Sequence, residues 1–242
     1  MDEPTLSEEG GIRYLHFDSP WVQGAMQVRH PNRLFLTYTQ LMMGWLLYAQ
    51  PDSDDRLTQL GLGAGSLTRF CYRHFDCPQT VVERSGGVIQ ICLQYFRLPV
   101  HERIELVCAD AQDWVADPAN HASSRILMVD LYDALAEGPV CDSLEFYENC
   151  ARVLPEDGIL TVNLFGEHDS YERNLLRIDE AFDGQFLLLP MTPEGNQIVL
   201  AFKSGIPGLS IDELLLRAQV IERQYRLPAN RWVRGLRKMV PA

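Results

Sequence analysis

The residues of this chain with the clearest chemical potential are a glycine-rich turn at 61–65 and three acids that come after it. Glycine lets a chain turn sharply and lets a ligand approach the backbone, and a helix that begins after such a turn offers free N–H groups. Glu83, Asp110 and Asp130 each end one of the next three strand-like runs. Since ligands of doubly wound sheets bind at the carboxyl ends of the strands, these acids would meet at one edge. The pattern predicts a nucleoside site at that edge.

The spacing of the glycines distinguishes two classes of nucleoside ligand. A dinucleotide-binding turn has glycine three residues after its second glycine, but here that position is Ser66. The third glycine comes one residue earlier, so the pattern is Gly61-x-Gly63-x-Gly65, which resembles the first motif of S-adenosylmethionine-binding proteins. A tight strand-to-helix turn that binds nothing would have the same sequence, so the turn alone leaves both interpretations open.

Two of the acids favour an adenosyl ligand at this turn. Glu83 ends the second strand-like run, 22 residues after Gly61, where a carboxylate can accept both ribose hydroxyls. Asp110 precedes Ala111 and is placed to accept from the adenine amino group. Each acid also has a structural interpretation, since Asp110 could cap a helix that begins at Ala111 and Glu83 could be a solvated strand end. The presence of both acids in register after the turn favours the ligand.

Composition narrows the class of protein. The chain has 242 residues and is 46% hydrophobic, which fits one α/β domain. Its formal net charge of -12 argues against a nucleic-acid partner and is compatible with a cationic substrate. With no run of 18 apolar residues and no basic-then-apolar N-terminus, neither a membrane-spanning helix nor a signal peptide is expected. Six scattered cysteines without a CxxC pair predict reduced thiols and a cytoplasmic protein, and the six histidines lack metal-ligand spacing.

Strands and helices alternate from residue 56 onward, which predicts a parallel sheet covered on both faces. A continuous apolar run such as 126–129 fits a strand that is buried on both sides. The predicted strands span 56–62, 80–83, 104–110, 126–131 and 158–164, and the helices between them span about 65–76, 86–96, 111–117 and 142–153. A helix near 170–182 is followed by strands at 185–190 and 197–202, whose tight turn makes this last pair antiparallel.

The fold class that follows is α/β, with a doubly wound, seven-stranded, mostly parallel sheet of the Rossmann-like methyltransferase type and an antiparallel last hairpin. Two short strands at 12–17 and 22–29 predict a small N-terminal β-hairpin ahead of it. We divide the chain into this hairpin, residues 1–31, and an adenosyl-binding catalytic domain, residues 32–242. The sequence further predicts helices at 34–48 and 211–224 and a solvated or frayed basic tail at 231–238.

The fourth predicted strand ends in two acids that point to a family. The segment 128–133 reads Met-Val-Asp-Leu-Tyr-Asp and is followed by Glu-Gly-Pro at 137–139 and Leu-Glu-Phe-Tyr at 144–147. Together with the segment 150–160, which leads from a helix into the fifth strand, these motifs resemble the spermidine synthase (polyamine aminopropyltransferase) family. The resemblance covers about residues 12–203.

The resemblance implies that the protein moves an aminopropyl group from decarboxylated S-adenosylmethionine to a di- or polyamine such as putrescine. Asp130 matches the acid that takes a proton from the amine, and Asp133 matches the acid that holds the substrate ammonium. Tyr38 and Gln23 match residues near the amine site, although Tyr38 also fits an apolar helix stripe and Gln23 a plain hairpin position. The family and the apolar hairpin further suggest a homodimer. The donor would lie on Gly61, Gly63, Gly65, Glu83, Asp110 and Ala111.

Departures from the family keep two other functions open. Where the family has an aspartate in its glycine turn to grip the amine of the donor, this chain has Ala64, and the usual Asp-Ser-Ser-Asp is Asp-Leu-Tyr-Asp. The family's closing aromatic near the last strands is replaced by Thr-Pro-Glu-Gly at 192–195. The segment 163–166 could line the site at the end of the fifth strand, but we favour simple strand termination. Without an acid at 64 the carboxylate of ordinary S-adenosylmethionine is repelled less, so a methyltransferase is the first alternative. A non-catalytic adenosyl-binding protein is the second.

Overall fold

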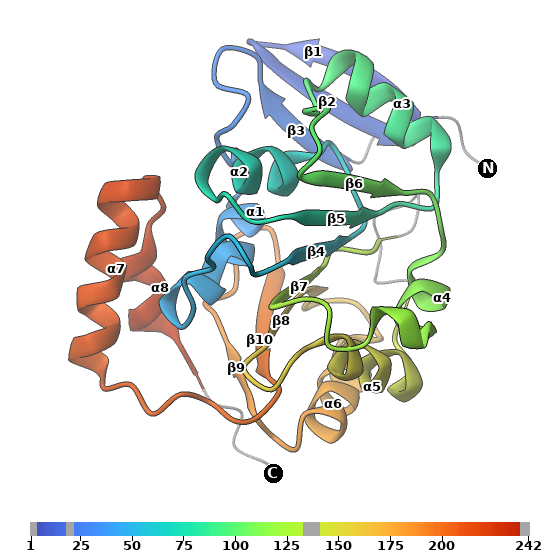
Figure 1. Cartoon of the computed structure of the whole chain (residues 1–242). Coiled ribbons are helices and arrows are strands. Elements are labelled where there is room, and N and C mark those ends of the chain that lie inside the picture. The colour runs from blue at the N-terminus through green and yellow to red at the C-terminus, as the bar shows by residue number, and fades with distance from the viewer. Residues whose placement is uncertain (1–3, 18–21, 133–140, 238–242) are drawn as a thin grey trace.

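Seven strands form the central sheet of the computed structural model, which describes residues 4–17, 22–132 and 141–237 (Figure 1). Their order across the sheet is β6–β5–β4–β7–β8–β10–β9. The strands are β4 Leu57–Leu60, β5 Gln79–Val82, β6 Ile104–Val107, β7 Ile126–Val129, β8 Ile159–Phe165, β9 Phe186–Leu188 and β10 Asn196–Phe202. The pairs from β6 to β8 are parallel, whereas β10 runs antiparallel to β8 and β9. The predicted fold class is therefore confirmed.

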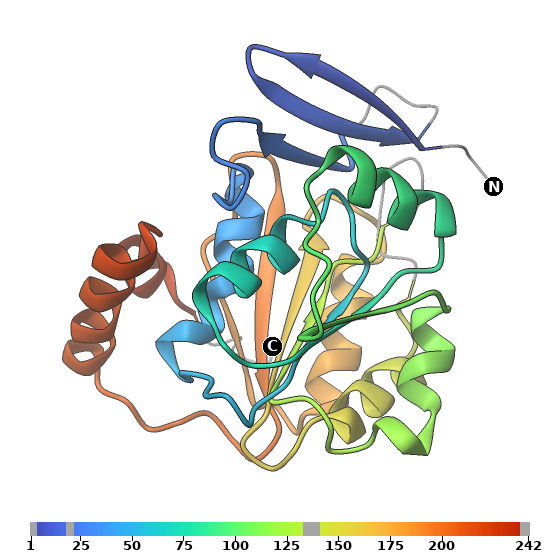
Figure 2. The ribbon, with the colours of Figure 1, turned by 45° about the horizontal axis from the view of Figure 1, so that its top comes forward.

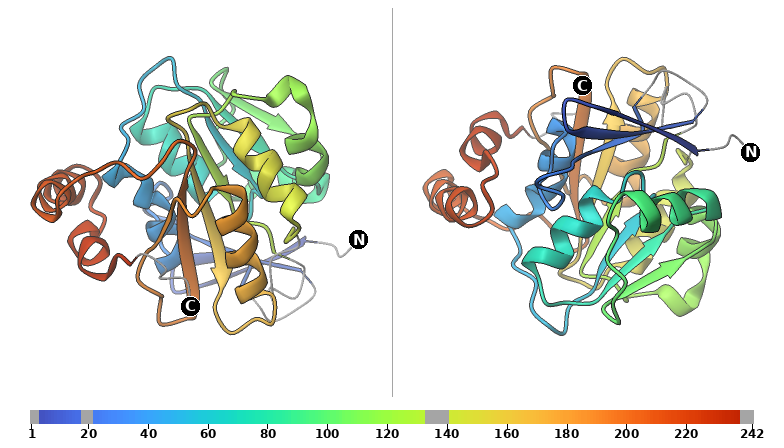
Figure 3. Two further views of the ribbon diagram at one scale, coloured as in Figure 1. Left: turned by 90° about the horizontal axis from the view of Figure 1, so that it is seen from below. Right: turned by 90° about the horizontal axis from the view of Figure 1, so that it is seen from above.

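Helices cover both faces of this sheet (Figure 2 and Figure 3). The four residues of β7 show why, because Ile126 and Met128 belong to one hydrophobic core and Leu127 and Val129 to the other. One core lies under α4 Ala111–Ala116, α5 Leu144–Val153 and α6 Tyr171–Ala181; the other lies under η1 Met42–Leu47, α2 Ser66–His74, α7 Ile211–Tyr225 and α8 Ala229–Gly235. A short 3₁₀ helix, η2, spans Pro118–Asn120. No helix in the described ranges is both long and apolar enough to cross a membrane.

The N-terminal part is a three-stranded antiparallel sheet, where the sequence pattern predicted a two-stranded hairpin. β1 Pro4–Glu9 pairs with β2 Ile12–Phe17, and β2 pairs with β3 Gly24–Gln27. The additional strand, β1, is an edge strand whose residues are mostly exposed, so it carries no buried apolar alternation that a sequence pattern could detect. β3 begins at Gly24, two residues later than predicted, and ends at Gln27.

This small sheet packs against the edge of the main sheet where the sequence predicts the nucleoside site. Leu15 and Met26 join Val88, Cys92 and Phe96 of the α3 region in a third hydrophobic cluster, where α3 spans Gly86–Tyr95. Figure 2 shows the N-terminal strands lying over that end of the central sheet. The sheet is therefore placed to cover the site.

Two helical predictions differ from the structure. The expected helix at 34–48 is divided into α1 Thr37–Leu41 and the 3₁₀ helix η1. The basic tail is not frayed within the described residues, because α8 buries Trp232 and Val233, which are 2% and 4% exposed, in the core. Arg231 and Arg234 lie on its exposed side, so the segment is amphipathic, and the basic residues concealed its apolar face in the sequence.

A buried guanidinium connects the glycine turn to its surroundings. Arg69 on α2 is 1% exposed and is the only charged side chain classed as buried among the residues described. It donates to the backbone carbonyls of Pro31, Ala64 and Phe96 at 2.8, 2.5 and 2.8 Å. Burial lowers the pKa of Arg69 to about 10, which leaves it protonated at neutral pH. The cation thus joins the turn, the chain before α1 and the end of α3.

Replacement of this guanidinium is expected to be strongly destabilising. Arg69→Met would leave three buried carbonyls without a donor, and each such loss costs roughly 1–3 kcal/mol, so the free energy of unfolding should fall by about 3 kcal/mol or more. Arg73→Met on the exposed side of the same helix is the control and should change it by less than about 0.5 kcal/mol. Urea unfolding of both variants measures the difference, and equal effects would contradict the assigned role of Arg69.

Candidate active site

The glycine turn after β4 lies against the chain that leaves β7. A β-carbon at Gly61, whose φ is +87°, would lie 2.2 Å from the carbonyl oxygen of Asp130, so only glycine fits there. The turn is also held from within the sheet. The Gln59 side chain donates to the Gly61 carbonyl at 2.6 Å and accepts from the Thr68 hydroxyl at 2.8 Å. The structure therefore brings the predicted donor turn and the predicted base together.

The N-terminal sheet closes on the same turn. A β-carbon at Gly24 would lie 2.6 Å from the β-carbon of Ala64, and one at Gly63 would lie 3.3 Å from the carbonyl oxygen of Gln23. Ala64 is 3% exposed and faces β3, so this packing leaves no room for a longer side chain at 64. The backbone of Gln23, which the resemblance places near the amine site, lies at the turn. Its predicted role toward a ligand remains a prediction.

Glu83 links the turn to the end of β5. Its Oε2 accepts from the Leu62 N–H at 3.0 Å, and its Oε1 accepts from the Ser85 N–H at 2.8 Å. Each carboxylate oxygen has a second lone pair, so Glu83 can hold the turn and still accept from a ligand hydroxyl. Glu83 therefore has a structural role at the end of β5. The predicted contact with the ribose hydroxyls is compatible with that role.

Asp110 is the N-cap of α4, which is the structural interpretation given above. Its Oδ1 accepts from the Gln112 N–H at 2.8 Å, and its side chain is exposed at the same edge of the sheet as Glu83. Ala111 follows as the first helical residue and is 7% exposed. The predicted contact of Asp110 and Ala111 with adenine remains a prediction.

Asp130 ends β7 in a partly buried position with two hydrogen-bond donors. The Asn163 Nδ2 donates to its Oδ1 at 2.9 Å, and the Tyr38 hydroxyl forms a second hydrogen bond with the carboxylate. Burial raises the pKa of Asp130 above its ordinary value, while both hydrogen bonds act to lower it. Burial and the nearby Asp130 raise the pKa of the Tyr38 phenol. Tyr38, predicted at the amine site, therefore contacts the predicted base.

Asn163 belongs to a polar group behind Asp130, although the sequence favoured simple strand termination for 163–166. It is 2% exposed and donates to Asp130 at 2.9 Å, and its Oδ1 accepts from the Asn196 Nδ2 at 3.1 Å. The Tyr132 hydroxyl donates to the Asn163 carbonyl at 3.3 Å. An asparagine inside the otherwise apolar run of β8 was the available indication, since a buried amide requires partners.

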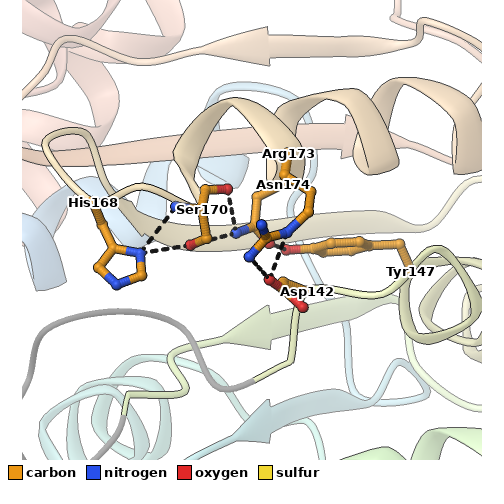
Figure 4. Close-up of polar contacts among 6 residues, drawn as sticks. All are labelled: Asp142, Tyr147, His168, Ser170, Arg173 and Asn174. Carbon is orange, nitrogen blue, oxygen red and sulfur yellow. Dashed lines mark hydrogen bonds and ion pairs between the residues drawn. The ribbon is translucent and has the colours of Figure 1, made fainter.

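Asp133, predicted to hold the substrate ammonium, lies outside the described residues. The described chain resumes close to a network that joins α5 to α6 (Figure 4). Arg173 donates through Nε to Asp142 at 2.9 Å, and the Tyr147 hydroxyl donates to the Asn174 side chain at 2.5 Å. His168 accepts from the Ser170 N–H at 3.1 Å in the loop after β8. These contacts fix the start of α5 against α6 and order the loop after β8.

The strand order and the glycine turn define the class of protein, a Rossmann-like fold of the methyltransferase type with its predicted site at the carboxyl ends of β4, β5, β6 and β7. A partly buried carboxylate with a raised pKa beside that turn is suited to accept a proton near neutral pH. Within the described residues, no group of three or more His, Cys, Asp or Glu side chains could hold a metal ion.

Comparison with known proteins identifies the family. A polyamine aminopropyltransferase of Neisseria meningitidis serogroup A is 34% identical over 99% of the chain and 90% of the relative. A probable spermidine synthase of Corynebacterium glutamicum superposes with a TM-score of 0.73 at 17% identity, covering 89% of the chain and 83% of that structure. Human methyltransferase-like protein 13 superposes with a TM-score of 0.69 at 22% identity, covering 79% and 93%. No family model matches. The chain belongs to the polyamine aminopropyltransferases, which are alkyl-group transferases.

Removal of the amide donor behind Asp130 is expected to displace the pH profile of the transferase reaction. Asn163→Leu removes a hydrogen bond that lowers the pKa of Asp130, so this pKa should rise. A base is lost by protonation as the pH falls, so the acid limb of kcat/KM should move to higher pH. Tyr38→Phe should move it in the same direction. Asn149→Leu, a buried asparagine on α5, is the control, and an equal displacement there would contradict the role of Asn163.

Proposed function

We propose that the protein transfers an aminopropyl group from decarboxylated S-adenosylmethionine to a di- or polyamine such as putrescine, with Asp130 as the base. The observation that carries the proposal is the contact between the Gly61 turn and Asp130, because it puts a nucleoside-type turn directly beside a carboxylate whose pKa is raised by burial. Membership in the aminopropyltransferase family supports the reaction type.

The proposed reaction is a single displacement at carbon. The lone pair of the acceptor amine attacks the aminopropyl carbon next to the sulfonium, a C–N bond forms, and the C–S bond breaks with its electron pair going to sulfur. The sulfonium becomes a neutral thioether, and the proton of the amine goes to Asp130. An alkylammonium has a pKa near 10, so a carboxylate that accepts a hydrogen bond from the amine and then its proton promotes attack near neutral pH.

Other residues have supporting roles in this proposal. The turn from Gly61 to Gly65 and the free lone pairs of Glu83 would hold the nucleoside, and Asp110 with Ala111 would lie at the adenine. Tyr38 would orient the carboxylate of Asp130, to which it is hydrogen-bonded. We propose in addition that Asp133 holds the far ammonium of the acceptor, that Gln23 contacts the ligand at the turn, and that the enzyme is a cytoplasmic homodimer.

Ala64 favours a methyltransferase as the second candidate. Its side chain faces β3, so the turn presents no acid to the amine of a decarboxylated donor and none to repel the carboxylate of ordinary S-adenosylmethionine. The fold is also similar to that of human methyltransferase-like protein 13, and a fold alone does not determine which group is transferred.

Calorimetric titration of the two donors separates these candidates. Aminopropyl transfer predicts that decarboxylated S-adenosylmethionine binds more tightly than S-adenosylmethionine, because an enzyme for this reaction must select the donor without a carboxylate. Tighter binding of S-adenosylmethionine would instead support methyl transfer. Tighter binding of decarboxylated S-adenosylmethionine without turnover of any amine would support the non-catalytic nucleoside-binding alternative.

Asp130→Asn is expected to abolish turnover without loss of the fold. Removal of a general base costs roughly 10²–10⁴-fold in rate, whereas donor binding by the turn should survive. Because the folded protein raises the pKa of Asp130, its charge costs stability as the pH rises through that pKa and costs none below the unfolded value. The variant should therefore gain thermal stability relative to wild type as the pH rises. Turnover assays and melting curves at pH 5 and 8 test this.

The matched control for this substitution is Asp54→Asn, at an exposed position in the loop before β4. It should leave turnover unchanged, together with the pH dependence of the melting temperature. Wild-type turnover by the Asp130 variant would show that another group takes the proton.

A further inference from the structure

Tyr132 lies on the acceptor side of Asp130. The residue between them, Leu131, points toward the glycine turn, since a β-carbon at Gly61 would lie 3.3 Å from its Cδ2. Tyr132 points the other way, with its hydroxyl 3.3 Å from the carbonyl oxygen of Asn163. The same Asn163 donates to Asp130 at 2.9 Å. The carboxylate and the phenol ring therefore share one region at the ends of β7 and β8.

One hydrogen bond fixes the phenol ring in place. Its hydroxyl donates to the Asn163 carbonyl at 3.3 Å, and the side chain of the same Asn163 accepts from the Asn196 Nδ2 at 3.1 Å. Asn196 is itself fixed by Thr192, whose hydroxyl accepts from its N–H at 3.0 Å. A ring held at its far end reaches from the end of β7 to β8 and cannot swing aside without breaking this bond. The Tyr132 ring therefore forms a boundary of this region at a fixed position.

The direction of attack in the displacement determines which substrate lies next to the Tyr132 ring. The donor groups proposed above, the turn and Glu83, lie at β4 and β5, on one side of Asp130. In a direct displacement the nucleophile attacks opposite the departing sulfur, so the amine comes from the other side, toward β8 and β10. Tyr132 occupies that side together with Asn163 and Asn196.

We propose that Tyr132 sets the length limit of the acceptor, so that the enzyme uses short linear diamines and excludes longer triamines. This inference rests on the proposed aminopropyl transfer. The usual family motif, Asp-Ser-Ser-Asp, has serine at this position. A serine would leave open the space that the tyrosine ring fills. The diamine also gains from the ring, because an ammonium beside a phenol face and a carboxylate is stabilised by both.

The test measures kcat/KM for propane-1,3-diamine, butane-1,4-diamine, pentane-1,5-diamine and spermidine. Wild type should prefer its best diamine over spermidine by about tenfold or more, and Tyr132→Ser should lower that ratio by about tenfold. Tyr132→Phe retains the ring and should retain the limit. Tyr95→Ser, an exposed tyrosine on α3, is the matched control. Tyr132→Leu, which leaves a smaller void, replaces the serine variant if melting curves show that the latter is unfolded.

Each outcome decides one of the two proposals. Equal use of spermidine and diamines by wild type, or an unchanged ratio in Tyr132→Ser, overturns the length limit while aminopropyl transfer stands. Absence of turnover with every amine overturns the proposed function. In that case calorimetry of the same amines, with methylthioadenosine present, still measures the limit, since loss of discrimination in Tyr132→Ser supports it and retained discrimination rejects it.

Discussion

The close approach of Gly61 to the backbone of Asp130 is the constraint on which the site depends. The parallel pairing of β4 with β7 carries Leu60 opposite Val129, and the chains can continue side by side only because residue 61 has no side chain, as a β-carbon there would lie 2.2 Å from the carbonyl oxygen of Asp130. The same strand pairing that builds the sheet thus sets the distance between the donor turn and the acid. A site assembled in this way is as rigid as the sheet.

The polar groups around Asp130 resolve a conflict between reactivity and solvation. A carboxylate in contact with bulk water would be a weaker base, while a fully desolvated one would stay protonated at neutral pH. Asn163 and Tyr38 each provide one hydrogen bond, which lowers a pKa that burial raises. The amide cannot turn, because its oxygen accepts from Asn196. β8 and β10 therefore determine the surroundings of Asp130, the proposed base, although neither carries an acid at this site.

The sequence predicted the features that depend on local pattern. The apolar run of β7 and the glycines with the acids after them are short-range patterns. They predicted correctly a mostly parallel seven-stranded sheet and the edge where Gly61 meets Asp130. What it missed depends on tertiary partners. β1 is polar and exists because β2 pairs with it, and α8 is buried through Trp232 despite its basic residues. Asn163 looked like the end of a strand because its two partners lie 33 residues away in either direction.

Packing explains why this chain has alanine at position 64, where the family has an aspartate. Gly24 and Ala64 are a matched pair of small residues, and a side chain added to either would meet the other's backbone or β-carbon. β3 therefore lies directly on the turn, held by the carbonyl of Ala25, which accepts from the Ser66 hydroxyl at 3.0 Å. An acid at 64 would be buried against this sheet without a partner, which costs more than it could return in ligand binding. For a cationic donor, the negative charge must then come from the ends of β5 and β7, where Glu83 and Asp130 lie.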